Sequence, residues 1–350
     1  MCAWRPIGVL WIGLCAMLCA TPLWASCAPQ AATEIVELGE VRLAYQSVGR
    51  EQDPAVLLLM GLGGQLIDWP DEVVSALCRQ GLRVIRFDNR GIGLSLWHGQ
   101  PESLPSLEFQ ALRYRLDLPV SAPYGLRDLA GDALALLDAL QIHKAHILGA
   151  SMGGMVAQHV AALAPQRVLS LTLVMSTSSD RGLPPPDEHV LRLLARRGAT
   201  DYEQRVNQQV ELLAALGNRQ WPTDMQQLKE GAEQSLARAG SPDGIRLQLL
   251  ALLAEAPRTE LLHRLQAPTL VVHGTADPLL PVMHGVHLAA QVPGAQLRLI
   301  PGLAHRFQPA FAAPLLAAVL PHLRAHTQPA SLAADWALRL PLHSRAPFAL

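Results

Sequence analysis

A serine, an aspartate and a histidine stand in an order suited to nucleophilic catalysis. Ser151 lies in the pentapeptide Gly149-Ala150-Ser151-Met152-Gly153, between the apolar segment 145–150 and the helical pattern of 152–163. A Gly-x-Ser-x-Gly motif between a strand and a helix is typical of a turn whose strained backbone projects the serine hydroxyl above a sheet. Because this hydroxyl is a poor nucleophile by itself, it needs a base and a group that orients the base.

Two side chains placed after later strand-like segments can fill these roles. Asp277 follows the apolar segment 269–273, and His305 follows the segment 296–300. The carboxyl ends of parallel strands meet at one edge of a sheet, where sites in open α/β sheets assemble. We therefore predict Ser151 as nucleophile, His305 as base and Asp277 as the acid. Asp180, after the segment 168–175, is a second candidate for the acid.

The same chemistry needs N–H donors for the oxyanion of a tetrahedral intermediate. The loop Met60-Gly61-Leu62-Gly63-Gly64 follows the apolar segment 55–60, and its glycines free the backbone to turn an amide inward. We predict the backbone N–H of Leu62 as one donor. The N–H of Met152, the residue after the nucleophile, is the other.

The segments that carry these residues predict an α/β fold with a mostly parallel sheet. Short apolar runs are separated by helical patterns, which suits strands buried on both faces. The predicted strands are 41–48, 55–60, 83–88, 145–150, 168–175, 269–273 and 296–300. The clearest helical periods lie at 126–140, 152–163 and 283–292.

One long interval breaks the alternation of strands and helices. Between 176 and 265 no strand pattern occurs, and helical patterns lie near 188–197, 202–216, 224–239 and 244–255. We predict a helical cap at 178–264, inserted between core segments 31–177 and 265–326. Residues 327–350 receive no assignment.

The first 27 residues predict a leader that exports the chain to the periplasm or outside the cell. Arg5 precedes an apolar run from Ile7 to Trp24, and small residues follow it, as in a secretory signal peptide. The run is also near the lower limit for a membrane span, so a membrane tether is an alternative, and a wrongly assigned start codon would leave a cytoplasmic protein. Cys27 follows Trp24-Ala25-Ser26, which resembles a bacterial lipobox and adds lipid anchoring at Cys27 as a further alternative.

Four of the five cysteines precede residue 28, which leaves Cys78 as the single cysteine of the body. Counted in this way, the body has no partner for Cys78, and we expect a fold without a disulfide. Cys78 lies in a helical apolar stretch and is expected to pack in the core.

Composition and spacing exclude several functional classes. With 50% hydrophobic residues the chain can bury a large core, and its net charge of −1 argues against nucleic acid as a partner. The pairs His143/His146 and His284/His287 lack the spacing of a zinc site, and the loop glycines 61, 63 and 64 do not fit a dinucleotide fingerprint. We expect neither a metal nor a cofactor. Asp88 and Arg90 are expected to hold a loop.

These motifs resemble the α/β-hydrolase superfamily over residues 35–325. Two motifs are similar to those of a bacterial branch of esterases that includes the aclacinomycin methylesterases. They are the loop 60–64 with Asp68-Trp69, and Phe87-Asp88-Asn89-Arg90-Gly91-Ile92-Gly93-Leu94-Ser95. Met60 stands where most relatives have His, and Ala304 where many have Gly before the histidine. Ser151 sets the chain apart from dehalogenases and epoxide hydrolases, which use Asp, and Met152 from proline iminopeptidases, which usually have Trp.

The resemblance and the residues together predict a serine hydrolase. Its substrate is expected to be a carboxylic ester of a small to medium apolar molecule, cleaved through an acyl-enzyme. Cofactor-free haloperoxidases and perhydrolases share the same residue set, so peroxidative chemistry stays open. A fold retained only for ligand binding is the alternative from another class. The sequence does not define the oligomeric state.

Overall fold

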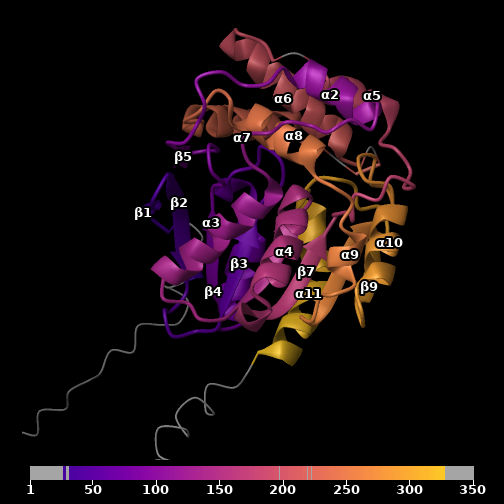
Figure 1. The fold of residues 1–350 in the computed structure, drawn as a ribbon. Coiled ribbons are helices and arrows are strands. Elements are labelled where there is room, and N and C mark those ends of the chain that lie inside the picture. Colours follow the sequence, from indigo (N-terminus) through magenta and orange to yellow (C-terminus); the bar gives the residue numbers. More distant parts are fainter. Residues whose placement is uncertain (1–26, 29–30, 197, 219, 222, 328–350) are drawn as a thin grey trace, which may run out of the picture.

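The computed structural model describes residues 27–28, 31–196, 198–218, 220–221 and 223–327 (Figure 1). Residues 1–26 of the predicted leader 1–27, and residues 328–350 of the unassigned C-terminal stretch, lie outside the described residues. The strands are β1 (Glu34–Leu38), β2 (Val41–Val48), β3 (Ala55–Leu59), β4 (Arg83–Phe87), β5 (Leu96–Trp97), β6 (Ala145–Ala150), β7 (Val168–Val174), β8 (Thr269–Gly274) and β9 (Gln296–Ile300). The helices are α1 (Asp71–Arg79), α2 (Leu107–Arg115), α3 (Leu126–Ala139), α4 (Met152–Leu163), α5 (Glu188–Leu194), α6 (Tyr202–Leu216), α7 (Met225–Arg238), α8 (Gly244–Ala254), α9 (Thr259–Leu262), α10 (Met283–Gln291) and α11 (Ala312–His326).

All strands of the described chain join one sheet, in the order β1-β2-β4-β3-β6-β7-β8-β9, with β5 paired to β2. The pairs from β4 through β9 are parallel, whereas β2 runs antiparallel to β1, β4 and β5. The predicted α/β fold with a mostly parallel sheet is confirmed. The register places Leu59 beside Gly149 and Ala150 beside Val174, so β3, β6 and β7 end side by side.

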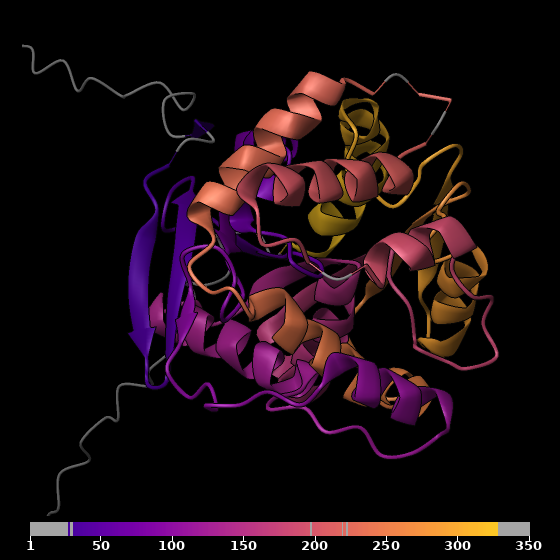
Figure 2. The ribbon, with the colours of Figure 1, turned by 90° about the horizontal axis from the view of Figure 1, so that it is seen from above.

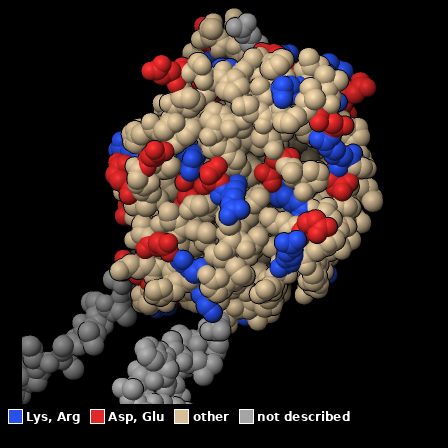
Figure 3. Space-filling model, in the orientation of Figure 1, with Lys and Arg blue, Asp and Glu red and all other residues tan. Residues whose placement is uncertain are grey.

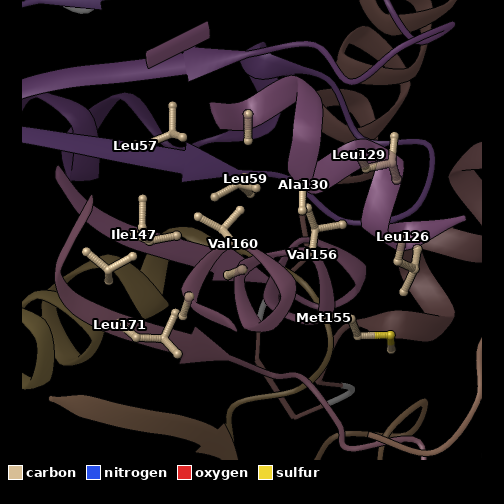
Figure 4. Close-up of a cluster of buried hydrophobic side chains, with 14 of the residues drawn as sticks. Leu57, Leu59, Leu126, Leu129, Ala130, Ile147, Met155, Val156, Val160 and Leu171 are labelled. Atoms are coloured by element: carbon tan, nitrogen blue, oxygen red, sulfur yellow. The ribbon is translucent and has the colours of Figure 1, made fainter. Parts of the chain in front are cut away.

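Alternate residues of the central strands enter two separate hydrophobic cores. Leu57, Leu59 and Ile147 face α3 and α4, where they meet Val156 and Val160 (Figure 4). Val56, Leu58 and Leu148 face α1 and α11 on the other side. Because side chains of a strand alternate between faces, continuous apolar runs are what a sheet covered on both faces requires.

The helices α5 to α8 lie between β7 and β8 in the chain and cover one end of the sheet (Figures 1 and 2). A helix outside this interval joins them: α2 packs beside α8, and Arg246 of α8 donates to the carbonyls of Leu104 and Pro105, just before α2. The layer over the site therefore has two sources, the interval predicted as a cap and the segment around α2, for which no helix was predicted.

The chain leaves the core for the cap and returns to it at adjacent points. Arg258, where it returns, donates its backbone N–H to the carbonyl of Ser178, where it leaves, at 2.9 Å. The buried Arg258 guanidinium also donates to the Thr177 carbonyl at 2.7 Å and to Gln158 of α4 at 2.7 Å. We call these four residues the cap stem. It ties both ends of the cap to the helix that follows the nucleophile.

A disulfide joins Cys27 to Cys78, whose Cα atoms are 5.5 Å apart. The expectation of a fold without a disulfide was wrong, because it assigned Cys27 to the leader and left Cys78 without a partner. Cys27 instead lies against the core, and both sulfurs are buried in the cluster that faces α1 and α11. Cys78 is thus a core residue, as expected, but as half of a cystine.

The face of the molecule seen in Figure 3 has no large patch of one charge. On the face in view in Figure 3, basic and acidic side chains are interspersed among uncharged ones. Within the described residues, no helix has the length and apolar character needed to cross a membrane.

Two buried histidines on the α11 side of the sheet make the fold sensitive to acid. Burial, with smaller contributions from His322 and His326, lowers the pKa of His146 to about 4. Burial also lowers the pKa of His322, on α11, to about 4. The unfolded chain takes up protons at these positions below about pH 6.5, but the folded chain only near pH 4. Folding stability that is complete above about pH 6.5 is therefore lost progressively toward pH 4.

We expect the free energy of unfolding, measured with urea, to fall between about pH 7 and pH 4. The loss is on the order of 3 kcal/mol for His146 and smaller for His322, which is less deeply buried. His322→Leu removes one of the two groups, so its stability should fall less steeply with acid than that of the wild type. Parallel curves for the two proteins over this range would contradict the assignment.

Candidate active site

Ser151 occupies a sharp turn between β6 and α4. Its φ of 54° and ψ of −121° lie in a region of backbone conformation that residues other than glycine rarely adopt. The end of β7 holds it there: Ser151 donates its N–H to Val174 O at 2.9 Å, and Ser176 Oγ donates to the Ser151 carbonyl at 2.9 Å. The strained turn thus places the hydroxyl at the carboxyl end of the sheet.

The turn requires a close approach that only glycine permits. A Cβ on Gly149 would lie 2.2 Å from the Gly153 carbonyl oxygen, and one on Gly153 would lie 2.1 Å from the Leu59 carbonyl oxygen. Both contacts are with backbone atoms, which cannot rotate away. The two motif glycines therefore set how tightly α4 packs against β6 and β3.

The three residues predicted as nucleophile, base and acid meet in one chain of hydrogen bonds. His305 Nε2 lies 2.9 Å from Ser151 Oγ, and His305 Nδ1 lies 2.7 Å from Asp277 Oδ2. With the carboxylate accepting from Nδ1–H, Nε2 is free to accept the serine proton. The cap also holds the histidine, since the His305 N–H donates to Leu216 O at the end of α6, at 2.9 Å.

Asp277 is a buried carboxylate with all its oxygens in use. Oδ1 accepts the N–H groups of Leu279, at 2.9 Å, and Leu280, at 2.7 Å, while Oδ2 faces His305. Burial alone would raise the pKa of Asp277, but His305, His273 and the Leu280 N–H outweigh it and lower the pKa below its usual value. The carboxylate is therefore ionised at neutral pH.

His273, at the end of β8, lies against this acid. Its Nε2 donates to Leu280 O at 2.7 Å and is 3.5 Å from Asp277 Oδ2. Burial lowers the pKa of His273, so the ring is neutral. Its Nδ1 has no hydrogen-bond partner among the described residues. His273 is thus a buried residue that supports the loop of the acid through the Leu280 carbonyl.

Asp180, the second candidate for the acid, has a different role. Its Oδ1 accepts the N–H of Gly182 at 2.9 Å, which closes a local turn after β7. Asp277 alone of the two aspartates contacts His305.

The loop 60–64 borders the nucleophile. A Cβ on Gly61 would lie 3.1 Å from Ser151 Cβ and 3.6 Å from Ser151 Oγ. Gly64 donates its N–H to Gly61 O at 3.1 Å, so the loop makes a tight turn at Leu62. Within the part of the chain that the structure describes, the backbone N–H groups of Leu62 and Met152 donate to no other group. Both are available to an acceptor at the site.

Asp88 joins the loops around the site. Its Oδ1 accepts the N–H of Leu66 at 2.6 Å, and Oδ2 accepts the N–H of Leu94 at 3.0 Å and Arg238 Nη2 at 2.8 Å. Asp88 is fully buried, and Arg238 belongs to cap helix α7. This agrees with the expectation that Asp88 holds loops. Its link to the cap was not foreseen, because nothing in the sequence pairs residues 150 positions apart.

Arg90 also holds a loop. Its guanidinium makes two hydrogen bonds of 2.6 Å with Asp132 of α3 and stacks near the rings of Trp97 and Tyr124.

Among the described residues, no group of three or more His, Cys, Asp or Glu side chains is arranged to hold a metal ion. The polar groups at the site are those of a hydroxyl, an imidazole, a carboxylate and free amides.

Known proteins with similar sequences and structures agree with this geometry. Residues 54–309 match the family model of the alpha/beta hydrolase fold. The rhodomycin D methylesterase DauP of Streptomyces sp. (strain C5) is 31% identical over 315 residues, covering 84% of this chain and 99% of the relative. The rhodomycin D methylesterase DnrP of Streptomyces peucetius is 30% identical with the same coverage. A solved hydrolase from Pseudomonas aeruginosa matches with a TM-score of 0.62 and 28% identity, covering 84% of this chain and 99% of that one.

The chain belongs to the α/β-hydrolase family. Its similarity to two methylesterases over nearly their whole length indicates, further, a hydrolase that acts on ester bonds. The resemblance expected from the motifs at 60–69 and 87–95 is thereby confirmed.

The glycine of the turn offers a direct test of the packing at the site. We expect Gly153→Ala to lower the free energy of unfolding by about 3 kcal/mol or more, because its Cβ would overlap the Leu59 carbonyl. Gly131→Ala is the matched control, since this glycine lies in helix α3 with no atom within 4 Å of the added Cβ. It should be neutral or stabilising by up to about 1 kcal/mol. Urea unfolding of both variants checks this, and equal effects would refute the close-packing argument.

Proposed function

We propose that this protein is a serine esterase that works through an acyl-enzyme, with Ser151, His305 and Asp277 as its catalytic residues. The observation that carries the proposal is the continuous chain of hydrogen bonds from Ser151 Oγ through the imidazole to Asp277 Oδ2. A hydroxyl that faces an unprotonated imidazole nitrogen is poised to lose its proton as it attacks.

In the first half of the reaction, Ser151 Oγ attacks the ester carbonyl carbon while its proton passes to His305 Nε2. The imidazolium that forms is stabilised by the ionised Asp277, which also fixes the Nδ1–H tautomer. The tetrahedral intermediate then collapses. His305 returns the proton to the alkoxy oxygen, the alcohol departs, and the acyl group stays on Ser151.

In the second half, His305 takes a proton from water, the hydroxide attacks the acyl carbon, and the acid is released as Ser151 regains its proton. The N–H groups of Leu62 and Met152 are the proposed donors to both oxyanions. Their position beside Ser151 and their lack of partners in the described chain support this role. Removing one such donor typically costs about 100- to 1000-fold in rate.

We propose an apolar substrate of small to medium size. Leu62 and Met152, in the loop and the turn at the nucleophile, both pack with the main hydrophobic cluster, and α8, with the sequence GIRLQLLALLA, lies over the loop. Ile245 of α8 comes within 3.2 Å of the Cβ position of Gly63. The two relatives named as methylesterases of rhodomycin D support an ester with a small alkoxy group.

Hydrolysis of p-nitrophenyl esters of increasing acyl length tests the proposal. We expect turnover by the wild type, with an optimum at short or medium chains, and a loss of about 10⁴-fold or more in kcat for Ser151→Ala. Ser106→Ala is the matched control, because Ser106 caps the exposed start of α2 and should leave kcat unchanged.

Other outcomes would replace the proposal. If the wild type neither hydrolyses these esters nor reacts at Ser151 with a fluorophosphonate, the nucleophile is inactive and the fold serves binding. If peroxide-dependent halogenation in acetate exceeds ester hydrolysis, the protein is a perhydrolase.

We also propose that the enzyme is exported and that its leader is cleaved before Cys27. The Cys27–Cys78 disulfide supports this, because disulfides persist in oxidising compartments outside the cytoplasm. The same bond argues against lipid anchoring, since lipidation would occupy the Cys27 sulfur.

The intact mass of the mature protein, taken from the cells that make it, tests this proposal. We expect a chain that begins at or shortly before Cys27 and gains two hydrogens on reduction, with neither cysteine alkylated beforehand. A lipid-modified Cys27, a retained leader, or two free thiols in the native protein would each overturn it.

A further inference from the structure

Gln248 is a polar side chain of cap helix α8 that reaches the loop beside the nucleophile. Its Oε1 accepts the backbone N–H of Gly63 at 2.7 Å, across 185 positions of sequence. Gln248 is completely buried. It therefore forms a direct hydrogen bond between the cap and the loop that carries the Leu62 N–H.

Gln248 accepts from the peptide between Leu62 and Gly63, whose orientation defines the type of turn in this loop. Gly64 N–H donates to Gly61 O, and of the two central residues only Gly63 has a positive φ, of +68°. These features are those of a type II turn. A type I turn would rotate the central peptide, between Leu62 and Gly63, by about 180°. Gly63 N–H would then point away from Gln248, so this hydrogen bond selects the type II form.

The anchoring of the turn matters because Leu62 is its second residue, and the Leu62 N–H, in the peptide from Gly61 to Leu62, is held in place only if the whole turn is held. The turn lies against Ser151, where a Cβ on Gly61 would be 3.6 Å from Ser151 Oγ. Leu62 N–H is therefore carried by a glycine-rich loop that has few side chains of its own to hold it. A fixed neighbour outside the loop is needed to keep this amide in place.

The segment that carries Gln248 is itself firmly attached to the core. Leu247 and Ala251, on either side of it in α8, belong to the main hydrophobic cluster. A Cβ on Gly244 would lie 1.9 Å from Gly91 O, so the start of α8 touches the core backbone. Gln248 thus acts from a rigid support.

The Nε2 of Gln248 has no hydrogen-bond partner within the described chain. Burying an amide nitrogen without a partner costs stability. An apolar side chain of similar length would avoid this cost, so stability alone does not account for a glutamine here. The hydrogen bond that its acceptor oxygen makes to Gly63 N–H does account for it.

We propose that Gln248 is a positioning residue for ester hydrolysis, which holds the loop 61–64 so that the Leu62 N–H faces the oxyanion. The inference rests on the proposed esterase function and adds the cap as the source of this support. Gln248 does not touch the reacting atoms. Its contribution reaches them through the Gly63 peptide.

The test compares Gln248→Met with the wild type on the best p-nitrophenyl ester. Met has a similar length but no acceptor for Gly63 N–H. We expect kcat to fall about 10- to 100-fold with KM changed less than about threefold, because the transition state loses a well-placed donor while binding is kept. The rate of Ser151 labelling by a fluorophosphonate, whose phosphoryl oxygen needs the same donors, should fall in parallel. Gln248→Glu keeps an acceptor oxygen and should lie between the two.

Arg246→Met is the matched control. Arg246 also lies on α8 and also holds a backbone, but its partners are the carbonyls of Leu104 and Pro105 near α2. It should leave kcat near the wild-type value. The proposal is overturned if Gln248→Met keeps kcat within twofold of the wild type, or if Arg246→Met loses as much.

A wild type that shows neither turnover nor fluorophosphonate labelling would instead refute the esterase function itself. The unfolding midpoint of each variant, measured alongside, separates a loss of kcat from a loss of folded protein.

Discussion

The close contact between α4 and the ends of β6 and β3 is the constraint on which the rest of the site depends. Two glycines allow backbone atoms to approach where any Cβ would overlap a carbonyl. This contact forces Ser151 into a conformation with positive φ, and the strain is offset by hydrogen bonds from the end of β7. The direction of the hydroxyl is thus decided by the packing of the core. The histidine, the acid and the loop 61–64 have only to come to a point that the sheet already defines.

The other groups of the site lie on short loops that are held by many hydrogen bonds. Asp277 is kept charged in a buried position by two amides and an imidazole, which is how a carboxylate avoids the cost of desolvation. Asp88 ties the loops on the other side with two backbone N–H groups and a cap arginine, although burial raises the pKa of this carboxyl above its usual value. Rigid loops of this kind keep donors and bases in place without rearrangement during the reaction. The cap contributes to this order through hydrogen bonds that include those of Leu216, Arg238 and Gln248.

Much of this arrangement could be predicted from local sequence. The central strands are nearly continuous apolar runs, and Ser151, Asp277 and His305 each follow a predicted strand, so their meeting at one edge could be expected. Contacts set by tertiary docking could not. Gln248 meets Gly63 and Arg238 meets Asp88 only because cap helices lie on particular loops, and no local pattern encodes that. The edge strands β1 and β5 and the helix α2 are short or weakly patterned, and their form depends on what they pack against. The disulfide was missed for another reason. The predicted leader was taken to include Cys27, which left Cys78 without a partner in the folded body.

The cap stem has a consequence for how this fold can diversify. The chain departs at Ser178 and returns at Arg258, and these two residues are joined by a single backbone hydrogen bond. An insertion whose ends already touch places no demand on the spacing of β7 and β8, whatever its length. The stem is thus a natural junction for exchange. Caps from relatives with other preferences could be grafted between Ser178 and Arg258 while the sheet and its nucleophile stay undisturbed, provided that the graft brings its own acceptor for Gly63 and its own cation for Asp88. Such chimaeras would separate the part of the molecule that chooses a substrate from the part that cleaves it.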